Sequence, residues 1–219
     1  MSGFSGSPRL LRGGIVLLDP ASSAVQRTIV LQYNPDTLTR SLQPKGAGGE
    51  GGDRSEALRL TGPPVETIKF DAEIDATDQL EHPEQNRLAA ELGIHPMLAA
   101  LEALVYPTAA KLHANNALAR SGTLEIAPME APLSLFVWSR NRVVPVRVTD
   151  FSVTEEAFDP ALNPIRAKVS LGLRVLSVDD LGFEHRGGGL YMAYQQQKEQ
   201  LAARSRNAGL AALGLRSIP

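Results

Sequence analysis

Apolar and polar residues alternate strictly from Ile165 to Val175. The odd positions are Ile, Ala, Val, Leu, Leu and Val, and Arg, Lys, Ser, Gly and Arg stand between them. Because successive side chains of a strand point to opposite faces, the pattern predicts a strand with one buried face and one polar face. At roughly 3.3 Å per residue this strand spans on the order of 35 Å, well beyond a typical strand of about five or six residues.

A second long strand is predicted just before it. Val144, Val146 and Val148 share one face, and the apolar register then moves to Phe151 and Val153. Such a change predicts a β-bulge near Asp150. Asp159-Pro160 and Asn163-Pro164 bracket the connection between the two runs, and both dipeptides favour turns. The sequence therefore predicts two neighbouring antiparallel strands, which form the wall of a barrel or sandwich whose polar face is covered by other subunits or by solvent.

Further strands are predicted on both sides of this pair. Ile15 to Leu18 and Ile29 to Tyr33 are apolar runs that a short polar turn joins into a hairpin. Val65 to Ala76 alternates, and its even positions from Ile68 to Ala76 are apolar. Leu133 to Trp138 is apolar on both sides at its end, so we expect a partner to bury one of its faces.

The helical signals lie in two places. Pro83 to Leu92 reads as a helix that Gly93 ends, and a second helix is predicted from Pro96 to Val105. Beyond the strands, Tyr191 to Arg206 is polar, rich in Gln and predicted to be helical. We therefore expect a mainly β fold with one or two helices.

This pattern divides the chain into two parts. Residues 1–181 are predicted to form one β domain, with a flexible Gly-rich loop at residues 44–55 and a helical insertion at residues 82–106. Residues 182–219 are predicted to form a helical or extended C-terminal tail of mildly basic character.

Composition narrows the classes of function. Hydrophobic residues make up 43% of the chain, which is enough for a core. A net charge of −2 argues against non-specific nucleic-acid binding, and the lack of cysteine excludes disulfides and thiolate metal sites. No apolar stretch has the length of a signal peptide or a spanning helix, so we expect a cytoplasmic protein without direct membrane insertion.

Candidate chemistry is sparse. Gly46 to Gly51 satisfies a GxGxxG pattern, but Asp53-Arg54-Ser55 and a short apolar run follow it and no helix begins there, so a flexible loop is favoured over a phosphate site. Asp71, Glu73 and Asp75 lie on one strand face in steps of roughly 7 Å, near Asp78. A divalent cation or paired acid–base chemistry fits that spacing, but a solvated or inter-subunit face is favoured. We therefore predict no enzymatic activity, no cofactor and no metal.

Several separate blocks carry a family resemblance. They are Tyr33-Asn34-Pro35-Asp36-Thr37-Leu38, Gly62 to Ile68 running into Phe70 to Asp78, Arg142 to Val146, Glu155 to Pro160, and Leu162 to Ala167. In this order they resemble the tube-type baseplate proteins of contractile injection systems, the phage-tail-like particles of bacteria. The resemblance covers roughly residues 11–181. Members of this family often carry a C-terminal LysM module, and its pattern does not occur after Leu181.

The resemblance implies a tail-tube fold and a structural role. Six copies would close a ring that initiates the inner tube and links it to the baseplate hub or spike and neighbouring baseplate proteins. One alternative is the repeating inner-tube or tube-cap protein of the same particle. Alternatives from other classes are a glycan-binding baseplate factor and a small-ligand-binding barrel.

A ring of six copies would need an interface between neighbouring subunits. Positive side chains are expected on the polar faces of the two long strands and negative ones on the Val65 to Ala76 strand, so that they meet between subunits. The residues concerned are Arg147, Arg166, Lys168, Arg174, Asp71, Glu73 and Asp75. The alternative is that these residues only line a wet lumen.

Overall fold

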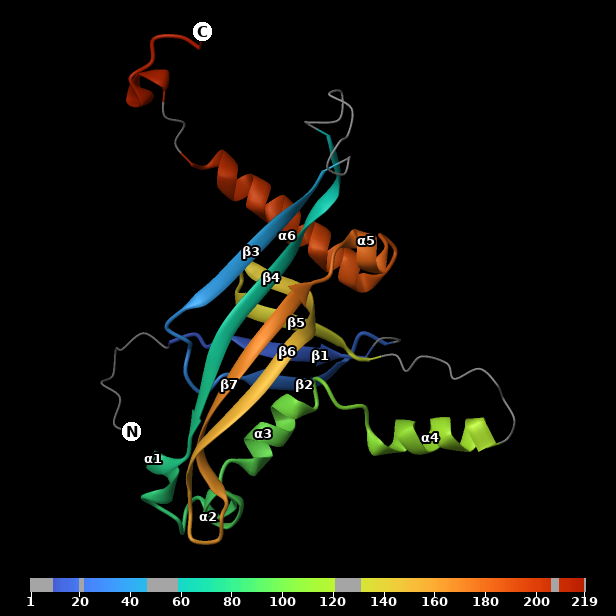
Figure 1. Cartoon of the computed structure of the whole chain (residues 1–219), viewed down its shortest axis with the longest axis vertical. Coiled ribbons are helices and arrows are strands. Elements are labelled where there is room, and N and C mark those ends of the chain that lie inside the picture. Colours follow the sequence, from blue (N-terminus) through green and yellow to red (C-terminus); the bar gives the residue numbers. More distant parts are fainter. Residues whose placement is uncertain (1–9, 20–21, 47–58, 121–130, 206–208, 219) are drawn as a thin grey trace.

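In the part of the chain that the structure describes, seven antiparallel strands form one sheet in the order β2-β1-β5-β6-β7-β4-β3 (Figure 1). The computed structural model describes residues 10–19, 22–46, 59–120, 131–205 and 209–218. The strands are β1 (Gly14–Leu18), β2 (Val25–Val30), β3 (Leu38–Gly46), β4 (Leu60–Asp75), β5 (Leu133–Ser139), β6 (Arg142–Phe158) and β7 (Pro164–Val175). The predicted mainly β class is confirmed.

The two long strands predicted from alternation are β6 and β7, which pair over nearly the whole of β7. Ala167, Val169, Leu171, Leu173 and Val175 are all buried, as the alternation predicts. The ladder shifts register between Val148 and Asp150, so the predicted bulge is confirmed. Gly172 stands opposite it, where an added Cβ would lie 2.8 Å from the Cβ of Asp150. Only glycine fits where the bulged strand approaches so closely.

The sheet curls until its inner face closes on itself. The ring of Phe70 on β4 stacks on that of Phe136 on β5, with 5.4 Å between the ring centroids, although β6 and β7 separate these strands in the sheet. The same buried cluster includes Ile15 of β1, Ile68 of β4 and Val144 of β6. Within the described residues the two edge strands, β2 and β3, do not pair with each other. The curled sheet is therefore an open barrel.

The helices are more numerous than the expected one or two. They are α1 (Thr77–Leu80), α2 (Arg87–Leu92), α3 (His95–Glu102), α4 (Ala109–Arg120), α5 (Val178–Leu181), α6 (Arg186–Ala203) and the 3-10 helix η2 (Leu210–Leu213). The helix predicted from Pro83 begins only at Arg87, and Gly93 ends it with a φ of +56°. The helix α3 occupies most of the second prediction. The helix α4 was not predicted, and none of its residues is buried.

Both faces of β5 carry buried residues, and the expectation that a partner covers one of them stays a prediction. Leu133 and Leu135 form a second buried cluster with Leu18 of β1. Leu181 of α5 and Leu190 of α6 pack against this cluster. Helices of the same chain thus cover part of β5. The alternation of a strand indicates that a face is buried, but it does not indicate which segment buries that face.

The helix predicted from Tyr191 to Arg206 is α6, and it begins five positions earlier. His185 precedes its first residue and accepts a hydrogen bond from the N–H of Gly187. Tyr191 and Tyr194 belong to the main buried cluster, so the first half of α6 packs on the β domain. The division of the chain at Leu181 stays a prediction. Residues 44–46 of the predicted Gly-rich loop belong to β3 instead, and residues 47–55 lie outside the described residues.

Candidate assembly surface

The charged residues predicted to meet between subunits lie side by side within one chain. The strands β4 and β7 are direct neighbours, and their register places Asp75 opposite Arg166, Glu73 opposite Lys168, and Asp71 opposite Ser170. All of these side chains point to the outer face of the sheet, away from the buried cluster. We call this face of β4 and β7 the charged ribbon.

Two ion pairs cross the charged ribbon. The Nε of Arg166 donates to Oδ2 of Asp75 over 2.8 Å, and the Nζ of Lys168 lies 2.8 Å from Oδ2 of Asp71. The hydroxyl of Ser170 donates to the other carboxylate oxygen of Asp71 over 2.7 Å. Hydrogen bonds from Lys168 and Ser170 lower the pKa of Asp71, and the same carboxylate raises the pKa of Lys168.

Asp75 also fixes the start of α1. Its carboxylate accepts hydrogen bonds from the N–H and the hydroxyl of Thr77. Partial burial raises the pKa of the Asp75 carboxyl, but the bonds from Thr77 and Arg166 outweigh it and the pKa is lowered. Asp75 is therefore held as a carboxylate in the folded chain at neutral pH.

The remaining members of the predicted set lie apart from these pairs. Arg174 stands opposite Arg147 on β6, and it turns to Asp180, with 2.7 Å between Nη2 and Oδ1. Arg147 is exposed, and neither it nor Glu73 forms an ion pair within the described part of the chain. The role of the seven residues between subunits stays a prediction, but five of them already have partners in their own chain.

A buried charge cluster on the inner face escaped the sequence analysis. Glu66 of β4 is 2% exposed, and Arg40 of β3 lies 2.7 Å from its Oε1. The hydroxyl of Tyr194 on α6 donates to the same oxygen over 3.3 Å, and the Nζ of Lys198 lies 3.9 Å from Oε2. Lys198 also sits over the ring of Tyr194, 4.4 Å from its centroid. The cluster joins α6 to β3 and β4.

Burial and Glu66 together shift the pKa values around it. Burial and the nearby Glu66 raise the pKa of Tyr194, whereas burial lowers the pKa of Lys198. Burial opposes the charge of Arg40, but its hydrogen bond to Glu66 raises the pKa overall. The sequence did contain a signal, since Glu66 occupies an even position of β4 and the even positions after it face the core.

The sheet ends in two open edges. The strand β2 forms one end of the strand order and β3 the other. Most of β3 is exposed, and with the first residues of β4 it projects from the body as a two-stranded ribbon (Figure 1). Such ribbons are marginally stable alone. Here Lys45 near its tip pairs with Asp179 of α5 over 2.7 Å, which holds the ribbon in place.

The described residues contain neither a cluster of metal ligands nor a membrane-spanning helix. No three His, Asp or Glu side chains of this part of the chain are placed to hold a metal ion together. In the same part, no helix has the length and apolar character needed to span a membrane.

Comparisons with known proteins give distant likenesses. No family model matches the chain, and no curated protein matches it. Among solved structures, a chain from the tail of an empty GTA particle with C6 symmetry is 11% identical, with a TM-score of 0.30, over 75% of this chain and 90% of that one. A chain from the virion of a native gene transfer agent particle is also 11% identical, with a TM-score of 0.27, over 74% and 90%. Both TM-scores lie below 0.5, so no conclusion about fold or function rests on them.

Proposed function

We propose that the chain is a structural subunit of a phage-tail-like injection particle and forms a ring that initiates the inner tube at the baseplate. The observation that carries the proposal is the sheet with two open edges, one of them on the long projecting β3. An exposed edge strand offers unpaired N–H and C=O groups to another chain. Contacts of one edge with a different surface of the next copy are heterologous, and they close a ring when the rotation permits.

In such a ring the long strands β4, β7 and β6 form the wall. The charged ribbon keeps the outer face of these strands polar, and its internal ion pairs satisfy Asp71 and Asp75 without a neighbour. Side-by-side copies would continue this face from subunit to subunit. One rim of the ring would match the baseplate hub and the other the inner-tube protein, so the ring would act as a template for assembly.

The blocks that resemble tube-type baseplate proteins support the particle, and they fall on the elements that build the wall. They cover much of β4, the first residues of β6, the turn after β6, and the start of β7. The repeating inner-tube or tube-cap protein of the same particle would use the same geometry. Immunogold labelling separates these roles, because an initiator is labelled at one end of the tube and a repeating subunit along its whole length.

Deletion of this chain from the producing cell tests the proposal. Without an initiator ring, electron microscopy of lysates should find neither assembled tubes nor sheaths, and complementation in trans should restore both. Particles with normal tubes in the deletion strain would contradict the proposal. Short or uncapped tubes would favour the alternative of a cap protein.

The predicted interface needs a variant that leaves the pairs within the chain intact. Arg147→Glu meets this condition, since Arg147 forms no ion pair within the described part of the chain. We expect negative-stain images of this variant to show fewer closed rings at an unchanged urea midpoint. Arg204→Glu, an exposed change at the end of α6, serves as the matched control. If Arg147→Glu forms normal rings, Arg147 does not contribute to the contact between subunits and only lines the lumen.

A further inference from the structure

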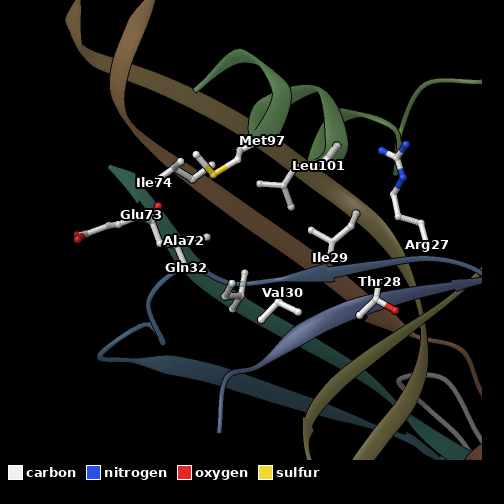
Figure 2. A pocket seen from close by; sticks show the side chains of 12 residues that line it. Arg27, Thr28, Ile29, Val30, Gln32, Ala72, Glu73, Ile74, Met97 and Leu101 are labelled. Atoms are coloured by element: carbon white, nitrogen blue, oxygen red, sulfur yellow. The ribbon is translucent and has the colours of Figure 1, made fainter. Parts of the chain in front are cut away.

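An apolar groove runs along the open edge of β2. It is lined by consecutive residues 27–32, by residues 72–74 of β4, and by Met97, Ala100 and Leu101 of α3, and its volume is about 320 Å³ (Figure 2). Successive side chains of a strand point to opposite faces of the sheet. Consecutive residues can therefore line one groove only if the groove follows the backbone edge of the strand. We call this groove the seam, because it separates the edges of β2 and β4.

The backbone of β2 has hydrogen-bonding groups on the side of the seam. Just after β2, the N–H of Leu31 donates to the carbonyl of Gly13, over 2.9 Å, on the side of β1. Backbone groups of alternate residues point to the same edge of a strand. Those of Thr28 and Val30 therefore point away from β1, towards the seam, where no described strand pairs with them.

The facing edge of β4 is open as well. Its pairing with β3 begins at Phe70, so residues 71–75 have no strand on that side within the described chain. Instead, the side-chain amide of Gln32 donates to the carbonyl of Asp75 over 2.6 Å and accepts from its N–H over 3.0 Å. This amide bonds to β4 as the peptide group of a neighbouring strand would. By alternation, the backbone groups of Glu73 and Asp71 point to the same open edge.

We propose that the seam binds an extended segment from a second copy of this chain, residues 213–218. Their sequence is Leu-Gly-Leu-Arg-Ser-Ile, and Leu213 and Leu215 are 75% and 44% exposed. In a strand, Leu213 and Leu215 would share one face and could pack on Ile29, Ile74 and Leu101 of the seam. Arg216 would then point outward, as does the carboxylate of Glu73 on β4, which forms no ion pair within the described chain.

The arrangement of the molecule favours a second copy over the chain's own segment. In Figure 1 the helix α6 leads away from the body, and η2 lies at the end of the long axis opposite to α1, α2 and α3. The seam lies between β2 and α3, in the half of the molecule away from η2. A segment at one end and its acceptor towards the other make a head-to-tail contact, which continues from copy to copy.

Sedimentation velocity and peptide binding with the purified chain test the inference without any particle. The proposed ring would also make the full chain associate, so binding of the free segment to the shortened chain is the result that separates the two proposals. We expect concentration-dependent association of the full chain and a monomer when residues 209–219 are deleted. A fluorescein-labelled peptide of residues 209–219 should bind the shortened chain in an anisotropy titration. A full chain that stays monomeric, or a peptide that does not bind, would overturn the inference.

Substitutions on both sides test the geometry. Val30→Pro removes an N–H that points to the seam and leaves the β1 side paired, so peptide affinity should fall about tenfold. A peptide carrying Leu213→Lys and Leu215→Lys should not bind, which tests the apolar face without altering the fold of the acceptor.

A charge exchange tests the register. A peptide with Arg216→Glu should bind about three- to tenfold more weakly, and Glu73→Arg in the acceptor should restore the affinity. The matched control is Glu199→Arg on α6, which should restore nothing. Equal affinity of all peptides, or rescue by the control, would show that the segment does not lie in the seam as proposed.

Discussion

The two faces of β4 and β7 hold charged residues in opposite ways. On the outer face, Asp75 pairs with Arg166, whose side chain is half exposed. On the inner face, Glu66 is 2% exposed and depends on Arg40, Tyr194 and Lys198. An exposed pair is solvated by water even when it breaks, whereas a buried carboxylate loses its compensation when a partner is removed. Similar ion-pair distances on the two faces therefore correspond to very different contributions to stability.

This contrast also separates the roles of the faces. The inner cluster joins α6 to β3 and β4, next to the apolar contacts that Tyr191 and Leu190 of this helix make. The charged ribbon costs little to change, and its exposed side chains remain available to solvent or a neighbouring subunit. We expect substitutions on the inner face to act on folding, and those on the outer face to act on assembly.

The largest expected effect is the loss of an apolar side chain from the inner face of β7. Leu173 is fully buried, so Leu173→Ala should lower the free energy of unfolding by about 2–5 kcal/mol. Lys168→Ala, on the outer face of the same strand, should have a far smaller effect. Urea unfolding followed by circular dichroism measures both, and equal shifts of the two midpoints would contradict the assignment of the faces.

The next largest effect is expected from the buried pair of Arg40 and Glu66, compared with the exposed pair of Arg166 and Asp75. Arg40→Ala leaves Glu66 buried with weaker compensation and should cost about 3 kcal/mol. Arg166→Ala, which breaks an exposed pair, should cost about 0.5 kcal/mol. Replacing Arg40 and Glu66 together by Leu should recover a large part of the first loss, because no buried charge is then left on Glu66. If the double variant is no more stable than Arg40→Ala, the cost does not come from the uncompensated carboxylate.

The smallest effect is the pH dependence of Asp75. Its pKa is lowered on folding, so its contribution is present above the unfolded value of about 3.9 and is lost as the pH falls through the folded pKa. At neutral pH, Asp75→Asn should cost about 0.5 kcal/mol, and 1 M NaCl should reduce the difference. Urea midpoints of both proteins at pH 7 and pH 2.5 test this, since the difference should be smaller at the lower pH.

Much of the β framework could be predicted from the sequence. The strict alternation of β7, the even-numbered apolar positions of β4 and the register change near Asp150 each follow from the two-residue repeat of a strand. These patterns are local, and each strand buries one face, so sequence and structure agree on them. The helix α4 was not predicted, because none of its side chains is buried and its sequence therefore lacks the apolar stripe of a packed helix.

The candidate sites show the limit of this reasoning. The charges of Asp71, Asp75, Arg166 and Lys168 and the faces on which they lie were readable from the sequence, but not that β4 and β7 are neighbours. Glu66 could be recognised as a polar residue at a core position, yet its partners come from β3 and α6, far away in the chain. Such contacts depend on strand order, which the alternation of any one strand does not contain.

The sequence by itself determined that β4, β6 and β7 are strands and which side of each is apolar, because the geometry of a single strand imposes that pattern. It did not predict β3, and β2 begins and ends earlier than the predicted run from Ile29 to Tyr33. The tertiary structure decided which strands are neighbours, that α5 and α6 cover the second face of β5, and where the curled sheet stays open. These features depend on contacts between distant segments, whose energies belong to pairs of residues rather than to any single stretch of sequence.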